Sequence, residues 1–443
     1  MTLNIGLNKK IILFVVDSLL FFGSLFFALW MRRPDIFNAD YFFSHIPRFS
    51  ILYIYFILAL YVAGLYELNN VYFRSKIYKF AFYIIISYIV FGVMNFYLLP
   101  SDYSPKTVLL MQSMMLLIAL VLWRQYSHKF LKTSSGIKAI ILDDNVERHQ
   151  MTAAINSFDY GIDLLDVNTH SKNLDSIKAD LYDLAIDKKL QIIFADIKNE
   201  KLKDLLPFIY SLSAQGVSLY DSKILYETIF KKMPLSGIGY FWFYENVSIN
   251  IQLYEFVKRI IDLLLAIPVF IVWVLLHPWV AYKIKKEDGG NIYSIQERLG
   301  RYNKKIYIKK YRTMTFTDKG VWLENSQNKV TSIGKFLRKT RIDELPQIFA
   351  VFRGDLSFIG PRTDIVNLGE KLANEIPYYN LRYSVIPGLS GWAQVNMDYQ
   401  PRNVEDSIER LKYDLYYVKH RSTFLDLAII LKTIKTVLSR EGS

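Results

Sequence analysis

The chain has 443 residues, of which 52% are hydrophobic, and its formal net charge is +13. This length predicts about three domains. The sequence contains no cysteine, which excludes disulfide bonds and thiolate metal sites, and its six histidines lack the spacing of zinc ligands. Any metal ion should therefore be hard and bound by oxygen atoms, as Mg²⁺ and Mn²⁺ are.

The N-terminal part contains four apolar runs, each close to the roughly 20 residues that a bilayer requires. They are residues 11–30, 51–66, 77–99 and 107–123. No small-residue cleavage site follows the first run, so we interpret it as a retained span and not as a signal peptide. Asp17 lies inside this run, and we favour a buried polar contact between helices over a functional role for it. We expect a transmembrane bundle at residues 1–132, serving as an anchor or an assembly surface.

Basic residues flank these runs mainly on one side of the expected membrane. They are Lys9, Lys10, Arg74, Lys76, Lys79, Arg124, Lys129 and Lys132, while Arg32 and Arg33 fall on the opposite side. Because cytoplasmic loops carry an excess of lysine and arginine, this pattern predicts a multi-pass protein with both termini in the cytoplasm.

A small α/β domain is expected at residues 133–245. Short apolar strands alternate there with polar, helix-like stretches, which is typical of a parallel sheet. The expected strands are residues 138–142, 162–167, 190–195 and 217–220. The first strand runs into Asp143 and Asp144 without a G-x-G-x-x-G sequence, and acidic side chains there would repel a pyrophosphate. We therefore expect a degenerate Rossmann-like domain with a scaffold or dimerisation role. The aromatic cluster at residues 240–244 would lie at a membrane interface or in an inter-domain core.

The last region, residues 246–443, opens with Lys258, Arg259 and Asp262 before an apolar segment that Pro268 interrupts. A run of ~10–14 apolar residues is more typical of a buried, interfacial or re-entrant helix than of a full span, and proline bends a helix. We expect a re-entrant helix at about residues 258–283 that enters one leaflet, turns at Pro268 and returns. Hydropathy alone also allows a kinked fifth span, which would place the basic region outside the cell, away from nucleotide substrates.

Asp343 and Glu344 are adjacent carboxylates among basic residues. Neighbours on a helix point about 100° apart, so the two side chains suit two tasks: one attacks phosphorus and the other holds a metal ion. Alternatively, acidic residues before Pro346 only favour a helix N-terminus. The surrounding arginines and glycines fit several phosphates around one metal ion. Nucleic acid is the rival partner for a basic chain, but the four spans and the absence of a recognition motif argue against it.

At this point the residues carry a family resemblance. Residues 258–438 resemble the bacterial polyprenyl-phosphate phosphoglycosyl transferases of the monotopic type, and the whole plan is similar to the large members that initiate O-antigen, capsule or exopolysaccharide synthesis. The matching motifs are K-R-x-x-D at 258–262, the Pro268 kink, residues 310–314, 342–347 and 354–362, P-G-L-S-G-W-A-Q-V-N at 387–396, D-L-Y-Y-V at 414–418 and L-D at 425–426. Many members continue directly with Gly-Arg after this W-A-Q-V-N stretch. Here Asn396 is followed by a longer loop, in which Arg402 would supply the cation.

The resemblance implies a two-step reaction. Asp343 would attack the β-phosphorus of a UDP-sugar, expel UMP and carry the sugar phosphate to undecaprenyl phosphate, while Glu344 would coordinate Mg²⁺. It also implies phosphate or nucleotide-sugar binding by Lys310, Arg312, Arg338, Arg341, Arg362, Gln394 and Arg402. Lys258, Arg259, Asp262 and Pro268 would hold the re-entrant helix near the polyprenyl phosphate. The catalytic domain should be α+β, with residues 407–420 and 424–438 as amphipathic helices at the headgroups or as ordinary core helices.

The implied location is the cytoplasmic face of the bacterial inner membrane. The implied partners are a UDP-sugar, undecaprenyl phosphate, the bilayer, downstream glycosyltransferases and a second copy of the chain. One alternative is a non-enzymatic scaffold of polysaccharide assembly, which would not need Asp343, Glu344 and their arginines. Another is a CDP-alcohol type of lipid phosphotransferase, which would carry aspartates inside transmembrane helices, where this chain has almost none.

Overall fold

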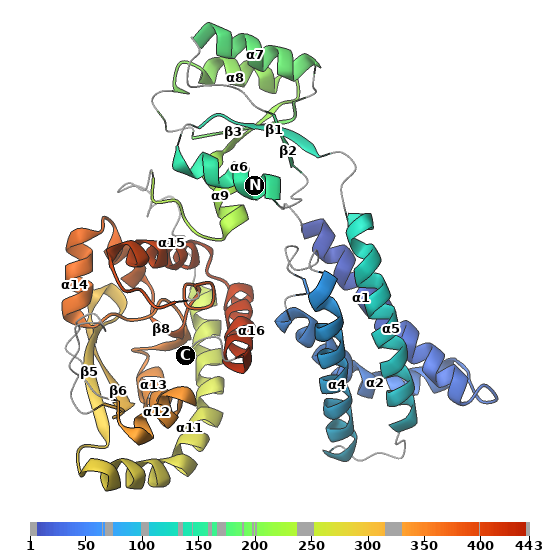
Figure 1. Ribbon diagram of the computed structural model, residues 1–443, viewed down its shortest axis with the longest axis vertical. Helices are drawn as coiled ribbons and strands as arrows, with labels where there is room; N and C mark the ends of the chain where they lie inside the picture. The colour runs from blue at the N-terminus through green and yellow to red at the C-terminus, as the bar shows by residue number, and fades with distance from the viewer. Residues whose placement is uncertain are drawn as a thin grey trace. The chain divides into compact units, whose positions relative to one another are not determined.

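The computed structural model (Figure 1) describes residues 7–63, 65–66, 74–98, 106–131, 136–143, 145–157, 162–165, 174–187, 190–196, 199, 202–236, 252–314, 330–397 and 399–439. The aromatic cluster at residues 240–244, Asp144, Lys132 and the domain boundary expected near residue 245 lie outside them. The chain divides into two compact units, Met1–Ile229 and Phe230–Ser443, and each is described by itself.

The first unit begins with four apolar helices. They are α1 (Leu7–Arg32), α2 (Ala39–Val62), α4 (Arg74–Leu98) and α5 (Lys106–Leu131). Helix α5 packs against α1 and α4, and α2 packs against α4. Helix α2 starts well before the apolar run that predicted it, because the Asn38 side chain caps its N-terminus by accepting a hydrogen bond from Tyr41 N at 2.8 Å.

Three of these helices are long and apolar enough to cross a membrane: α1, α2 and α5. Within the described residues, the apolar part of α4 is the shorter segment Ala81–Phe96. The fourth helix that meets the criteria is α11, in the second unit. Four helices of the described residues are therefore long and apolar enough to span a bilayer, and α4 covers the expected run at residues 77–99 as far as Leu98, as a helix of 25 residues.

Asp17 and Arg124 form a buried ion pair between α1 and α5. Arg124 Nη2 lies 2.6 Å from Asp17 Oδ2, and both side chains are almost fully buried. The expectation of a buried polar contact at Asp17 is thus confirmed. Arg124, in contrast, is not in a loop. It lies within α5 and neutralises Asp17. It therefore does not count among the basic loop residues from which the membrane orientation was predicted.

The second part of the first unit is an α/β domain. Its strands β1 (Ile137–Ile141), β2 (Ile162–Leu164), β3 (Ile192–Ala195) and β4 (Ser218–Asp221) form a parallel sheet in the order β2-β1-β3-β4. Figure 1 shows α7 (Leu174–Asp187) and α8 (Leu206–Ser213) on one face, with α6 (Val146–Ser157) and α9 (Ser222–Phe230) on the other. Asp143 follows β1 and is buried, and its Oδ1 accepts a 2.7 Å hydrogen bond from Asp196 N. This carboxylate links the ends of two strands.

The second unit is an α+β domain built around one long helix, α11 (Gln252–Asp288). An antiparallel hairpin of β5 (Tyr293–Leu299) and β6 (Lys305–Tyr311) follows, and β7 (Ser357–Ile359) pairs with β8 (Gly388–Ser390) in parallel. The other helices are α12 (Ser332–Lys339), α13 (Ile348–Arg353), α14 (Val366–Glu375), α15 (Val404–His420) and α16 (Thr423–Ser439), with 3₁₀ turns η2 (Arg301–Asn303), η4 (Ile342–Gln347) and η5 (Tyr379–Ser384).

Helix α11 is continuous through Pro268 and Pro278, and Figure 1 shows that its two parts run in different directions. Its apolar side chains are largely exposed, for example Leu264 (62%) and Leu275 (73%). Such a surface is costly in water and stable in lipid. Of the two C-terminal helices, α15 buries Leu411 and Leu415 in the core, whereas α16 buries Ile429 and exposes Phe424.

Candidate active site

Asp343 and Glu344 lie in the first turn of η4, directly after α12. The turn begins at Arg341, whose φ of 57° is left-handed and reverses the chain between α12 and η4. Neighbouring residues in a 3₁₀ turn point about 120° apart, because the turn has ~3 residues. The two carboxylates accordingly have different surroundings.

Glu344 is held by two cations from different elements. Its Oε1 atom lies 3.1 Å from Lys310 Nζ on β6 and 3.5 Å from Arg362 Nη2, which follows β7. Burial alone would raise the pKa of Glu344, but Lys310 and Arg362 lower it to about 2. Glu344 is therefore ionised throughout the physiological range.

Lys310 is the cation nearest to this carboxylate. Burial lowers the pKa of Lys310 to about 8, although Glu344 opposes the shift, and the neighbouring Arg362 and Arg298 add to it. Lys310 therefore carries its charge at neutral pH but loses it at mildly alkaline pH.

Asp343 has the opposite character. It is 9% exposed, and its Oδ1 atom is buried without a hydrogen-bond partner among the described residues. Burial raises the pKa of Asp343, and the Glu344 carboxylate raises it further, while Lys310, Arg338 and Arg341 act against the shift. A buried oxygen without a partner costs free energy, and such groups in native structures often have a chemical role. Asp343 is thus the carboxylate of the pair that keeps a buried oxygen without a partner among the described residues.

Backbone contacts hold the segment that carries Arg362. Arg382 Nη2 donates to Arg362 O at 2.8 Å, and Arg298 Nη1 donates to Thr363 O at 2.9 Å. Arg382 is itself fully buried and pairs with Asp364 and with Asp414, whose Oδ2 lies 2.7 Å from Arg382 Nη2. This buried network fixes the backbone from which the Arg362 side chain reaches Glu344.

A close approach of two glycines precedes Arg362. Gly360 N donates to Ser390 O at 2.9 Å, and Gly388 N donates to Pro361 O at 3.0 Å. A Cβ atom on Gly388 would overlap the backbone of Gly360. Only glycine therefore lets the ends of β7 and β8 meet. This close contact explains the glycines of the Gly-Pro-Arg and Pro-Gly-Leu-Ser-Gly sequences at positions 360 and 388.

Of the other residues expected to bind phosphate, some lie near the carboxylate pair and others do not. Arg338 Nε donates to Thr313 Oγ1 at 2.9 Å, and both Arg338 and Arg341 are near enough to influence Asp343. The Arg312 guanidinium lies against Gly290. Within the described residues, neither Gln394 nor Arg402 hydrogen-bonds with the carboxylate pair. Gln394 Nε2 donates to Leu389 O at 3.4 Å, and Arg402 is exposed, with its backbone N–H on Asp406.

Three expected residues of the membrane helix dock it onto the domain. Arg259 donates to Val351 O at 2.6 Å and to Phe352 O at 2.7 Å, which satisfies carbonyls at the end of α13. Asp262 Oδ1 accepts from Ser357 Oγ and Phe358 N, both at 3.0 Å, and Lys258 Nζ lies 2.9 Å from Asp426 on α16. These side chains fix the helix relative to η4 and β7. Pro268 is exposed within α11.

Sequence reasoning missed the residues that support the site. Asp414 lies within the matched D-L-Y-Y-V stretch and Arg298 lies in β5, but residue type and spacing alone give neither of them a role. Arg382, Asp364 and Arg410 complete the network, with Arg410 Nη2 at 2.9 Å from Asp364 Oδ1. Burial alone would raise the pKa of Asp364, but Arg382 and Arg410 hold it well below its usual range.

The donors around Asp343 and Glu344 fit a magnesium ion that is completed by substrate. The described residues contain no cluster of three side chains able to hold a metal ion by themselves. Mg²⁺, however, is commonly bound by one or two carboxylates together with substrate phosphates and water. Lys310 and Arg362 both contact Oε1 of Glu344, which leaves its Oε2 atom for an ion.

The sequence of this chain matches a known protein family and several named relatives. The family described as "Bacterial sugar transferase" matches residues 253–440, which include α11, η4 and α16. An uncharacterised sugar transferase of Bacillus subtilis is 34% identical over 191 residues, covering 42% of this chain and 89% of that protein.

Two relatives have more specific names. The UDP-N-acetylgalactosamine-undecaprenyl-phosphate N-acetylgalactosaminephosphotransferase of Aeromonas hydrophila is 33% identical over 261 residues, covering 57% of this chain and 60% of the relative. The undecaprenyl-phosphate galactose phosphotransferase of Salmonella typhimurium is 31% identical over 240 residues, covering 48% and 49%. The chain thus spans about half to three-fifths of these relatives, and their names give different sugars.

Proposed function

Because the chain belongs to the bacterial sugar transferase family, we propose that it transfers a sugar phosphate from a UDP-sugar to undecaprenyl phosphate. UMP is released and undecaprenyl-diphospho-sugar is formed. The relatives' names support this reaction class, since they act on undecaprenyl phosphate. The expected family is confirmed, and the protein is a membrane protein with four helices able to span a bilayer.

The observation that carries the proposal is the contrast between Asp343 and Glu344. Glu344 is neutralised by Lys310 and Arg362, whereas Asp343 keeps a buried oxygen without a partner. A nucleophile must be free to attack, while a carboxylate among cations can orient phosphate-binding groups. The pair therefore supports nucleophilic attack by Asp343, with Glu344 as the organising group.

In the first step, an Asp343 oxygen forms a bond to the β-phosphorus of the UDP-sugar. The bond from this phosphorus to the bridging oxygen breaks, and UMP leaves with the electron pair. In the second step, the phosphate of undecaprenyl phosphate attacks the same phosphorus, and the Asp343 carboxylate is regenerated. No oxidant, reductant or net proton donor is needed for the transfer.

Lys310 and Arg362 would bind the diphosphate as charge moves onto the leaving UMP. Arginine offers two parallel donors to phosphate oxygens, and lysine a compact positive charge. A Mg²⁺ ion on Glu344 would neutralise the diphosphate when bound, as in other phosphoryl transfers. Arg338 and Arg341 would supply further positive charge next to Asp343, and Arg312, Gln394 and Arg402 would bind the nucleotide-sugar.

We propose that α11 is a re-entrant helix and that the catalytic unit lies on the cytoplasmic face of the bacterial inner membrane. The exposed apolar side chains of α11 and its bend in Figure 1 support this arrangement. A UDP-sugar is soluble and undecaprenyl phosphate is not, so the reaction needs a site at the membrane surface. The product would enter exopolysaccharide, capsule or O-antigen synthesis through downstream glycosyltransferases, with the chain acting as a homodimer.

The experiment that tests the function is UMP release by the detergent-purified full chain with undecaprenyl phosphate, Mg²⁺ and a panel of UDP-sugars. We expect release with one sugar, abolished in Asp343→Asn and strongly reduced in Glu344→Gln. Glu370→Gln, at an exposed position of α14, is the matched carboxylate control.

Without undecaprenyl phosphate, one UMP per active site should be released, and the sugar phosphate should stay on Asp343, identifiable by mass spectrometry. Turnover that persists in Asp343→Asn would overturn the nucleophile. Folded protein that releases no UMP with any sugar would favour the scaffold alternative.

A further inference from the structure

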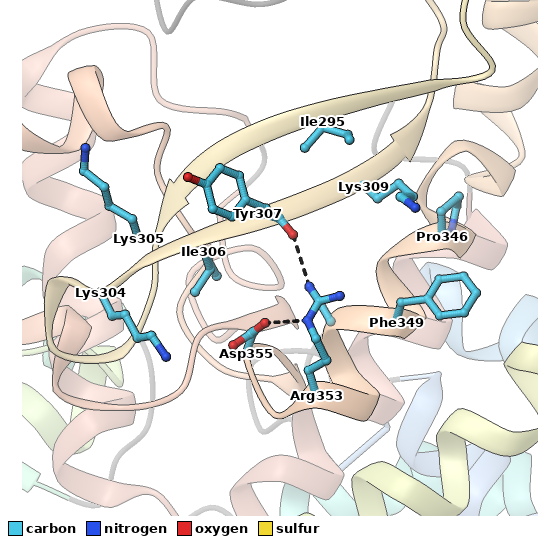
Figure 2. A pocket seen from close by; sticks show the side chains of 11 residues that line it. Ile295, Lys304, Lys305, Ile306, Tyr307, Lys309, Pro346, Phe349, Arg353 and Asp355 are labelled. Atoms are coloured by element: carbon cyan, nitrogen blue, oxygen red, sulfur yellow. Dashed lines mark hydrogen bonds and ion pairs between the residues drawn. The ribbon is translucent and has the colours of Figure 1, made fainter.

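A pocket lies beside the β5–β6 hairpin, with a volume of about 540 Å³. Figure 2 shows Lys304, Lys305 and Lys309 around it, together with Arg353 and Asp355. Strand β6 is hydrogen-bonded only to β5 among the described strands, and Arg353 donates to Tyr307 O, a carbonyl of β6, at 3.3 Å. The function proposed above makes no use of this pocket.

The pocket touches η4 through Pro346, but its lysines do not belong to the carboxylate site. Successive side chains of a strand point to opposite faces, so Lys309 and Lys310 point apart. Lys310 contacts Glu344, whereas Lys309 lines the pocket and has its Nζ 4.9 Å from the centre of the Tyr293 ring. An anion on Lys309 is therefore not on the same face of β6 as Glu344.

Two of the cations, Lys304 and Lys305, are without a close ion pair in the described part of the chain. Arg353 is committed to Asp355, with Nε to Oδ2 at 2.8 Å. Lys304, in contrast, has no carboxylate within 4.0 Å in the described part of the chain, and Lys305 has only a loose 3.6 Å contact with the partly exposed Glu297. Such exposed pairs contribute little. Uncompensated lysines around a pocket indicate an anionic ligand.

One wall of the pocket continues into the membrane helix. Phe349 lines the pocket, and its ring lies 4.9 Å from the Trp273 ring and 6.1 Å from the Phe270 ring of α11. The neighbouring α11 residues Ile271 and Leu275 are 54% and 73% exposed. A cationic rim thus adjoins an apolar surface that suits acyl chains.

We propose that this pocket binds the headgroup phosphate of an anionic phospholipid, whose acyl chains lie along α11. A charged headgroup joined to an apolar chain matches the two surfaces that meet at Phe349. A nucleotide would leave the apolar wall unused. Undecaprenyl phosphate is a less suitable ligand for this pocket, because its phosphate must reach Asp343. A phosphate bound to Lys309 would lie on the face of β6 opposite to Lys310 and Glu344. This lipid site is not needed for the proposed transfer of sugar phosphate. Lipid binding can therefore be measured without enzyme turnover.

The test uses the detergent-purified full chain, titrated with phosphatidylglycerol or with phosphatidylcholine of equal chain length. Bound lipid is counted by native mass spectrometry. We expect saturable binding of phosphatidylglycerol, weaker by roughly ten- to 100-fold after Lys304→Gln, Lys305→Gln and Lys309→Gln together, since each lysine near a lipid surface supplies up to about a factor of five. The corresponding Lys→Arg triple variant keeps the charges and should keep the binding.

A charge-matched control replaces the exposed Lys335, Lys339 and Lys371, which lie outside the pocket, with Gln. Equal losses in both Gln variants would mean general surface attraction and overturn the proposal. Equal binding of phosphatidylcholine would also overturn it. Competition by undecaprenyl phosphate would assign the pocket to the acceptor, and competition by UDP-sugar to the nucleotide, and either result would refute a phospholipid site.

Discussion

Oε1 of Glu344 lies 3.1 Å from Nζ of Lys310, and this pair joins the η4 turn to strand β6. The same oxygen is 3.5 Å from Arg362 Nη2, so one carboxylate atom joins η4, β6 and the segment that follows β7. Asp343 is next to it in sequence but takes no part in these ion pairs. Because only Glu344 is paired with these cations, Lys310 and Asp343 should control opposite sides of the pH profile of activity.

Replacing Lys310 should change the alkaline side of the pH profile. Because the pKa of Lys310 is lowered to about 8, the positive charge is lost as pH rises through that value, and kcat/KM should fall there. Lys310→Arg keeps the charge at all accessible pH values and should move the fall to higher pH. Lys310→Met should lower kcat about 10²–10³-fold, as the loss of an electrostatic stabiliser does. A wild-type profile that stays flat above pH 8 would contradict this assignment.

Asp343 should control the acid side. Burial raises its pKa, and the negative charge of Glu344 adds to the shift, while the attacking form is the deprotonated one. Activity should therefore decline, as pH falls, at a value above the ordinary aspartate pKa of about 3.9. Glu344→Gln removes the neighbouring charge, so the decline of its residual activity should move to lower pH. Both profiles are measured as UMP release, and a shift to higher pH in Glu344→Gln would show that another group titrates.

The sequence predicts those residues of the site that short motifs mark, and it does not predict contacts between residues that are far apart in the chain. The carboxylate pair, Lys310 and Arg362 were identified from residue type, spacing and family resemblance, and the structure brings these four side chains together. The Asp364–Arg382–Asp414 network was not identified, because its members are far apart in sequence and their pairing exists only in the folded chain.

Hydropathy has the same limitation. It identified the apolar runs but could not show that Arg124 is buried against Asp17, since a buried arginine and a loop arginine look alike in sequence. The turn at Pro268 stays a prediction: α11 bends, yet it stays helical through both of its prolines. The loss of one backbone hydrogen bond at each proline does not end the helix.

The buried network should contribute strongly to stability. Asp414→Ala would leave the fully buried Arg382 with one carboxylate fewer, and breaking a buried pair in this way costs about 3–5 kcal/mol. Thermal unfolding in detergent should show a clearly lower midpoint. Glu375→Ala removes the exposed 3.8 Å pair with Lys371 and should change stability by less than about 1 kcal/mol. Similar midpoints for the two variants would show that the network is not structurally important.

Asp262 should couple the membrane helix to the catalytic domain through its two hydrogen bonds. Its Oδ1 accepts from Ser357 Oγ and from Phe358 N, both at 3.0 Å, where α11 meets β7. Asp262→Ala removes both bonds and leaves two donors without a partner, which should cost about 2–4 kcal/mol. Asp262→Asn keeps an accepting oxygen and should cost less. Ser357→Ala leaves the bond from Phe358 N, but it removes both the bond to Asp262 and the 3.2 Å bond that Ser357 Oγ accepts from Ile359 N, so part of its effect does not depend on Asp262.

A double-mutant cycle separates this coupling from local damage. If the Ser357 hydroxyl acts mainly through Asp262, the effects of Asp262→Ala and Ser357→Ala on the unfolding midpoint should sum to less than full additivity, because both substitutions remove the same Ser357–Asp262 bond. Additive effects would show that the two side chains stabilise the fold independently. The docking of α11 would then depend on the neighbouring contacts of Arg259 with the carbonyls of Val351 and Phe352, and Arg259→Gln would be the variant that loosens the helix.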